Sequence, residues 1–172
     1  MQTVHFVSIL LHILAAVVWI GGMVFLGAIL IPVLRRTRAE GGQYAELIHR
    51  TGTRFRNVGW ACLVILVVTG FVNLATRWGV GFERLHSADL WASPWGHILA
   101  TKLVLVAAAL AISGVHDFVV GPRATRTLRT APGSKEAGRL RRAAGWMGRA
   151  NLLIAVVIVS LGMMLVRGPV VW

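Results

Sequence analysis

The sequence predicts an all-α integral membrane protein, a four-helix bundle in which every helix crosses the bilayer. The chain has 172 residues, of which 56% are hydrophobic and 14% charged, and its mean hydropathy is +0.72. A soluble domain has about 25% charged residues, so this chain has too little polar surface to cover a water-facing globule. Four apolar stretches each approach the roughly 20 residues that cross a hydrocarbon core as a helix, and these are residues 4–34, 58–76, 98–120 and 150–166.

The first stretch is predicted to be a retained span that ends near residues 32–36. It runs far beyond the apolar region of a signal peptide and begins without a basic segment. The segment 39–56 then places Tyr44, Leu47 and Ile48 at helical spacing. This spacing predicts a short amphipathic helix on the inner membrane surface.

The second stretch is followed by a connection rich in Trp and Gly, which suits the aromatic belt of a membrane interface. The third stretch is expected to stop at Gly121–Pro122, because such a pair breaks helices. The fourth is expected to run from about Met147 to Arg167. No stretch predicts a separate soluble domain, so residues 1–172 are predicted to form a single domain.

The formal net charge of +12 predicts how the helices are oriented. Arginines concentrate in the first connection, residues 35–56, and in the third, residues 123–149, whereas the second connection is nearly neutral. By the positive-inside rule, both basic connections are cytoplasmic and both termini face outward, as expected in a bacterial inner membrane. The excess charge thus indicates contact with anionic lipid and argues against nucleic-acid binding. Cys62 is the only cysteine, which excludes an internal disulfide and predicts a packed apolar residue.

One layer in the outer half of the bundle is predicted to collect polar and sulfur-bearing side chains. At a rise of about 1.5 Å per residue, His12 lies roughly 9 Å outward of the midplane. His5 shares one helix face with His12, and His97 is expected near the height of His5. The other three helices are expected to contribute Asn73, Lys102, Met163 and Met164 at the height of His12.

A second polar cluster is predicted at the inner boundary, where His116 and Asp117 share their depth with Arg56. Asp117 is the only acidic residue within a span, and an unpaired carboxylate there costs at least about 2.5 kcal/mol. A nearby arginine, Arg56 among them, is therefore its expected partner. Because His12 and His116 differ by roughly 21 Å along the membrane normal, they are not expected to ligate one haem.

From the residues alone, the outer layer supports three kinds of chemistry. A neutral His12 can ligate haem iron, with Lys102 available to the haem propionates. Imidazole and thioether ligands together suit copper. His12 and Lys102 could also relay protons without a metal. Structural roles stay open beside these, since His12 could bond a neighbouring helix and the methionines could pack in the core.

The stretch LLHILAAVVWIGGMVFL resembles the first helix of CopD-type copper-resistance membrane domains and of HemJ-type protoporphyrinogen oxidases. The shared pattern is His12, then Trp19 seven residues later, then small residues. WGHILATKLVLVAAALAISGVHDF is similar to their third helix, with Lys102 before a long apolar run. The CopD resemblance implies copper handling. The HemJ resemblance implies a haem b oxidase in which a first-helix histidine and a third-helix lysine are important, and His12 and Lys102 match that pair.

The sequence therefore predicts a CopD/HemJ-type protein that binds haem b for electron transfer or membrane oxidoreduction, with a redox partner or a homodimer as possible assemblies. The expected haem contacts are His12, Lys102, His97 and Asn73. One alternative is a copper-handling transporter, whose ligands would be His5, His12, Met163 and Met164. Another is a cofactor-free accessory subunit. The inner cluster of His116, Asp117 and Arg56 is left open as a second site.

Overall fold

Four long antiparallel helices form the bundle in the computed structural model, which describes residues 2–36, 41–80 and 82–167. The described residues form helices and no strand. Four helical segments are long and apolar enough to cross a membrane, which confirms the predicted fold class, and these are Gln2–Leu34, Glu46–Thr76, Pro94–Thr130 and Lys135–Arg167.

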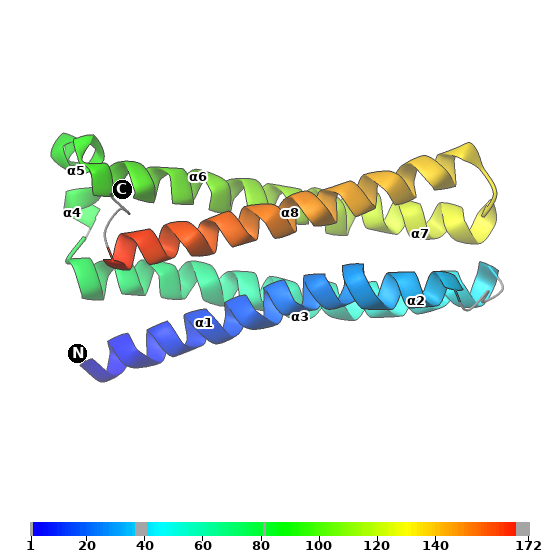
Figure 1. Ribbon diagram of the computed structural model, residues 1–172, viewed down its shortest axis with the longest axis horizontal. Coiled ribbons are helices and arrows are strands. Elements are labelled where there is room, and N and C mark those ends of the chain that lie inside the picture. Colours follow the sequence, from blue (N-terminus) through cyan, green and yellow to red (C-terminus); the bar gives the residue numbers. More distant parts are fainter. Residues whose placement is uncertain (1, 37–40, 81, 168–172) are drawn as a thin grey trace.

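The helices run side by side along the long axis of the molecule (Figure 1). The start of α1 (Gln2–Val24) and the end of α8 (Lys135–Arg167) lie together at one end, which we call the terminal end. The opposite end, which we call the arginine end, holds the arginine-rich parts of α3, α7 and α8. The remaining elements in chain order are η1 (Phe25–Leu30), α2 (Ile31–Arg36), α3 (Gly41–Trp78), α4 (Phe82–Leu85), α5 (Ala88–Ala92), α6 (Pro94–Val115), η2 (His116–Val120) and α7 (Gly121–Thr130).

The helices extend further at the arginine end than the apolar stretches alone indicate. Residues 41–56, expected as a short amphipathic helix that leads directly into the second span, form the first part of α3, which continues without a break to Trp78. The remainder of that expected segment, residues 39–40, lies outside the described residues. α8 likewise begins at Lys135, twelve residues before the expected start at Met147. Basic residues are good helix formers, so the helices continue past the end of their apolar segments.

The expected helix stop at Gly121–Pro122 is wrong, because a widened turn lets the helix continue. In η2 the backbone N–H of Gly121 donates to the carbonyl of His116, five residues back rather than four. In η1 the N–H of Ile31 donates to Leu26 in the same way, immediately before Pro32. A proline ring clashes with the carbonyl four residues earlier in a regular α-helix. Each π turn inserts one extra residue before its proline and so relieves that clash.

The core occupies the middle of the bundle and is built from small and aromatic side chains. α1 packs mainly against α3, and α6 mainly against α8. Trp19 is 7% exposed and lies over Gly59, where a Cβ atom would be 3.6 Å from its ring. Cys62 is buried in the same cluster, which confirms that it packs as an apolar residue.

Large apolar side chains cover the outside of the bundle. Phe6, Val104 and Leu153 are each about two-thirds exposed, at 67%, 68% and 67%. Such surfaces are rare on water-soluble monomers. They are expected where helices with satisfied backbones face lipid.

Candidate functional site

The predicted histidine of the first helix lies on the seam between α1 and α3. His12 is half-buried, and its Nδ1 lies 2.8 Å from Oγ1 of Thr69. The hydroxyl of Thr69 has a single proton, which it donates to the carbonyl of Ile65 at 2.5 Å. Nδ1 of His12 must then be the donor to Thr69. The other ring nitrogen, Nε2, therefore carries the lone pair, which is the form of neutral imidazole that binds metals.

The same arrangement recurs one heptad away. Nδ1 of His5 lies 3.0 Å from Oγ1 of Thr76, and this hydroxyl donates to the carbonyl of Val72 at 2.8 Å. Because α1 and α3 are antiparallel, His5, seven residues before His12 in α1, faces Thr76, seven residues after Thr69 in α3. Two imidazoles with the same hydrogen bonding thus follow one seam, about 10 Å apart along the helix axis. We call His5, His12, Thr69 and Thr76 the histidine seam.

Lys102 of α6 lies near the histidine seam. It is half-buried, and its ammonium group is close enough to the His12 imidazole to interact with it electrostatically. A Cβ atom on Gly162 of α8 would lie 3.3 Å from Nζ of Lys102, so the glycine makes room for this group. His12 and Lys102 thus lie on two different spans within electrostatic range of each other, and a shared ligand site stays a prediction.

The other side chains predicted for this layer are more scattered. Met163 is 56% exposed, Met164 is half-buried, and His97 is exposed at the start of α6. The amide oxygen of Asn73 is buried and has no hydrogen-bond partner among the described residues. Participation of these four side chains in ligand binding stays a prediction.

The inner cluster forms around Asp117, but its partner is not the expected arginine. Oδ1 of Asp117 accepts from Nδ1 of His116 at 2.8 Å, and Oδ2 accepts from Nε1 of Trp60 at 3.0 Å. No arginine pairs with Asp117 among the residues that the structure describes. Arg56 instead lies over the ring of Phe118, 5.5 Å from its centroid. The N–H of the half-buried Trp60 indole needs an acceptor, and it takes the carboxylate oxygen that an arginine was expected to occupy.

A third polar cluster lies between the other two along the bundle. Nδ2 of Asn151 donates to Oγ of Ser113 at 3.0 Å and lies 3.9 Å from Sδ of Met23. The amide oxygen of Asn151 is buried and has no partner among the described residues. Sequence spacing gave no signal for this cluster, because its members lie on three different helices.

Comparison with known proteins decides the family. The profile of copper resistance protein D, CopD, matches residues 49–165, which is more than half of the chain. The chain belongs to the CopD family. It is also 27% identical over 154 residues to an uncharacterized protein of Aquifex aeolicus (strain VF5), covering 88% of each chain. No solved structure matches.

Membership confirms the CopD part of the predicted resemblance, whereas the HemJ part stays a prediction. With its four apolar helices, this CopD protein is a multi-pass membrane protein. The family match covers Thr69, Lys102 and His116 but not His5 or His12, which precede it.

Within the described residues, this CopD protein has no group of three His, Cys, Asp or Glu side chains placed to hold one metal ion. Each candidate ligand is a single imidazole whose Nδ1 is hydrogen-bonded to another side chain. Sequence reasoning found the histidines but missed Thr69, Thr76 and Trp60. The available signals were the matched heptad spacing of the two threonines and the need of a membrane tryptophan for an acceptor.

Proposed function

We propose that this protein passes copper through the membrane, with His5 and His12 as successive ligands of Cu(I). The observation that carries the proposal is the repeated His–Thr–carbonyl hydrogen-bond chain on the α1–α3 seam. Membership of the copper resistance protein D family agrees with copper as the substrate.

The hydrogen bonding of the seam suits metal ligation. Histidines that bind metals usually donate their other ring N–H to an oxygen, which fixes the tautomer and the ring orientation. Thr69 and Thr76 provide that oxygen at 2.8 and 3.0 Å. Cu(I) accepts imidazole and thioether ligands, so a half-buried Met164 and the sulfur of Met23 are further contacts for an ion moving along the bundle.

Haem b is a second candidate, favoured by the position of Lys102. An ammonium group beside a neutral imidazole does not help to bind a cation, because like charges repel. It would instead pair with a haem propionate, while Nε2 of His12 would be the axial ligand. Haem binding would use the Lys102 ammonium group as the partner of a propionate, whereas copper binding would not use it. The two candidates can therefore be distinguished by experiment.

The test uses the full-length protein purified in detergent, with bound copper and the visible spectrum measured on the same sample. Copper handling predicts Cu(I) binding that falls at least about tenfold in His12→Ala, an effect typical of losing a metal ligand. The exposed His97 provides the matched control, and His97→Ala should bind as the wild type does. A Soret band that disappears in His12→Ala would support haem b instead. Equal copper binding by wild type and His12→Ala, with no Soret band, would refute both candidates.

A further inference from the structure

A cavity of about 260 Å³ opens at the arginine end, away from the histidine seam. Its apolar wall includes Leu26 and Leu30 of η1 and Leu128 of α7. Both π turns border it, since His116 and Asp117 of η2 also line it. Such turns are frequent at functional sites in helices. The cavity therefore combines an apolar body with a polar edge.

The polar edge carries a cation that forms no ion pair among the described residues. Arg56 lines the cavity, is half-buried, and is held over the Phe118 ring. No carboxylate pairs with Arg56 among the described residues. Asp117 is the one carboxylate in the cavity lining, and its two oxygens accept hydrogen bonds from His116 and Trp60. These two hydrogen bonds partly stabilise the charge of Asp117. The N–H donors of Arg56 remain available to another partner.

Two further carboxylates lie near this end in the described part of the chain, Glu46 and Glu136, and Glu136 of α8 is exposed and does not line the cavity. Glu46 of α3 pairs with Arg50 at 2.6 Å and with Arg129 of α7. It is therefore not available to Arg56. A partly desolvated guanidinium attracts an anion, and its planar set of donors matches phosphate and carboxylate oxygens.

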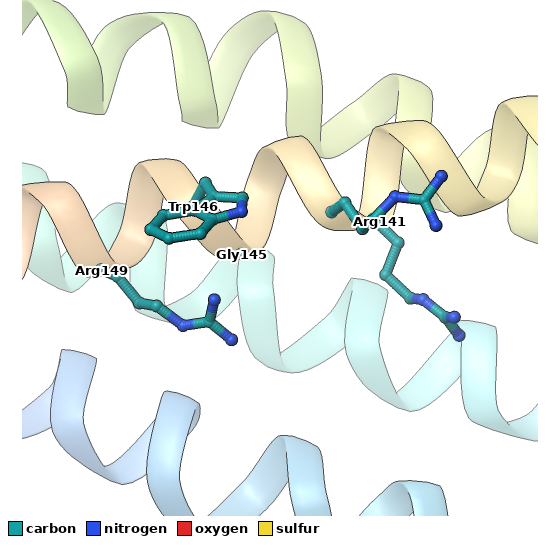
Figure 2. A pocket seen from close by; sticks show the side chains of 5 residues that line it. Arg141, Gly145, Trp146 and Arg149 are labelled. Atoms are coloured by element: carbon teal, nitrogen blue, oxygen red, sulfur yellow. The ribbon is translucent and has the colours of Figure 1, made fainter.

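A second arginine connects the cavity to the surface of the bundle. Arg141 and Gly145 line both the cavity and a shallow surface pocket of about 150 Å³ on α8. Figure 2 shows this surface pocket, in which the guanidinium of Arg149 lies over the Trp146 ring, 5.3 Å from its centroid. Tryptophan and arginine are typical of the membrane interface. A ligand in the cavity is therefore reachable from the interfacial region.

We propose that this cavity binds an amphiphilic anion, with a phosphate or carboxylate group on Arg56 and Arg141 and an apolar body against Leu26, Leu30 and Leu128. The volume lies just below the 300–1,000 Å³ of common small-molecule pockets, so it suits a head group with a short length of alkyl chain. The site is independent of copper and of the histidine seam. Its ligand is either a lipid of the bilayer or a soluble amphiphile with the same head group.

The test measures binding of octyl phosphate, octyl glucoside and inorganic phosphate to the full-length protein in phosphatidylcholine nanodiscs. We expect octyl phosphate to bind saturably and at least about tenfold more tightly than either comparison compound, because only it offers both parts of the ligand. Arg56→Gln should weaken octyl phosphate binding by about tenfold or more. Arg123→Gln is the matched control, since Arg123 is an exposed arginine of α7 that does not line the cavity.

A second variant keeps the proposal testable if Arg56→Gln fails to fold. Ala144 lines the cavity, and Ala144→Leu fills part of its apolar body without removing a charge. It should weaken octyl phosphate binding and leave the weak binding of inorganic phosphate unchanged. Equal binding of octyl phosphate and octyl glucoside, or wild-type affinity in both variants, would overturn the proposal.

A separate measurement distinguishes the two sources of ligand. The protein is reconstituted with phosphatidic acid in the phosphatidylcholine, extracted with detergent, and examined by native mass spectrometry. Retention of phosphatidic acid by the wild type and its loss in Arg56→Gln would identify a membrane lipid as the ligand. Octyl phosphate binding without retained phosphatidic acid would identify a soluble amphiphile. Either result supports the site.

Discussion

At the scale of single residues, the hydrogen-bond partner of Nδ1 determines whether each histidine can bind a metal through Nε2. An imidazole alone has two tautomers, and only one of them presents Nε2 as a ligand. Thr69 and Thr76 select that tautomer, because each hydroxyl gives its own proton to a carbonyl of its helix. A threonine hydroxyl thus fills the place that a carboxylate takes in many metal sites.

Thr69→Val tests this role of the hydroxyl. Valine keeps the shape of the side chain but leaves Nδ1 of His12 without an acceptor. We expect Cu(I) affinity to fall about 10- to 100-fold, the usual effect of losing the group behind a metal-binding histidine. Copper binding to the purified protein measures it, and Thr69→Ser should restore most of the affinity.

Thr101→Val is the control for this substitution. Thr101 is exposed, and among the described residues its hydroxyl bonds only the carbonyl of His97 in its own helix. An equal loss of copper binding in the two valine variants would contradict the role assigned to Thr69.

The hydrogen bond from Trp60 to Asp117 gives a second prediction at this scale. Trp60→Phe removes the N–H donor and leaves one oxygen of a partly buried carboxylate without its partner. We expect a loss of about 1–3 kcal/mol in stability, measured as a lower midpoint of thermal unfolding in detergent. Trp146→Phe should have little effect, because Trp146 is 67% exposed. Similar midpoints for the two variants would show that this hydrogen bond contributes little.

At the scale of helices, the first and third membrane-crossing helices share one feature, a π turn near the arginine end. Each turn precedes a proline, and each borders the cavity at the arginine end. In η2 the turn also requires a glycine, since a Cβ atom on Gly121 would lie 2.9 Å from the carbonyl oxygen of His116. The turn fixes the positions of His116 and Asp117, so its geometry matters to the inner cluster.

Gly121→Ala therefore should destabilise the protein. The added methyl group forces the His116 carbonyl to move, at a cost of about 1–3 kcal/mol typical of overpacking. Gly114→Ala in the same membrane-crossing helix is the control, because nothing lies within 4 Å of the Cβ position there. We expect that change to be neutral or slightly stabilising in the same unfolding measurement. A larger loss for Gly114→Ala would refute the account of η2.

At the scale of the whole molecule, one end of the bundle carries the arginine-rich parts of α3, α7 and α8, and the other carries the short helices α4 and α5. This distribution predicts the orientation in the membrane through the positive-inside rule. In this predicted orientation, the histidine seam is in the outer half of the bundle, and the cavity at the arginine end is near the cytoplasmic face.

Cysteine labelling tests the orientation. In a Cys62→Ser background, Ala88→Cys places a thiol at the terminal end and Ala131→Cys places one at the arginine end, both at exposed positions. We expect a membrane-impermeant maleimide to label Ala88→Cys in intact cells and Ala131→Cys only after the membrane is opened. The reverse pattern would invert the topology and move the histidine seam to the cytoplasmic half.

Much of the fold follows from local properties of the sequence. Four apolar stretches of membrane-crossing length determine four helices, since the backbone must satisfy its own hydrogen bonds in lipid. Their order and short connections determine antiparallel neighbours. The depth predicted for His12 and Lys102 rests on the constant rise of a helix. The helix stop expected at Gly121–Pro122 was wrong because the structure continues through a π turn, a hydrogen-bond shift that composition does not encode.

The sequence by itself thus determined the four membrane-crossing helices, and it predicted a layer in which an imidazole and an ammonium group meet. Only the tertiary structure decided the partners. Thr69 lies 57 residues from His12, and Trp60 lies 57 residues from Asp117. Which face of one helix meets which face of the next depends on packing across the whole bundle. Hydrogen bonds between those faces therefore have no signature in any local stretch of chain.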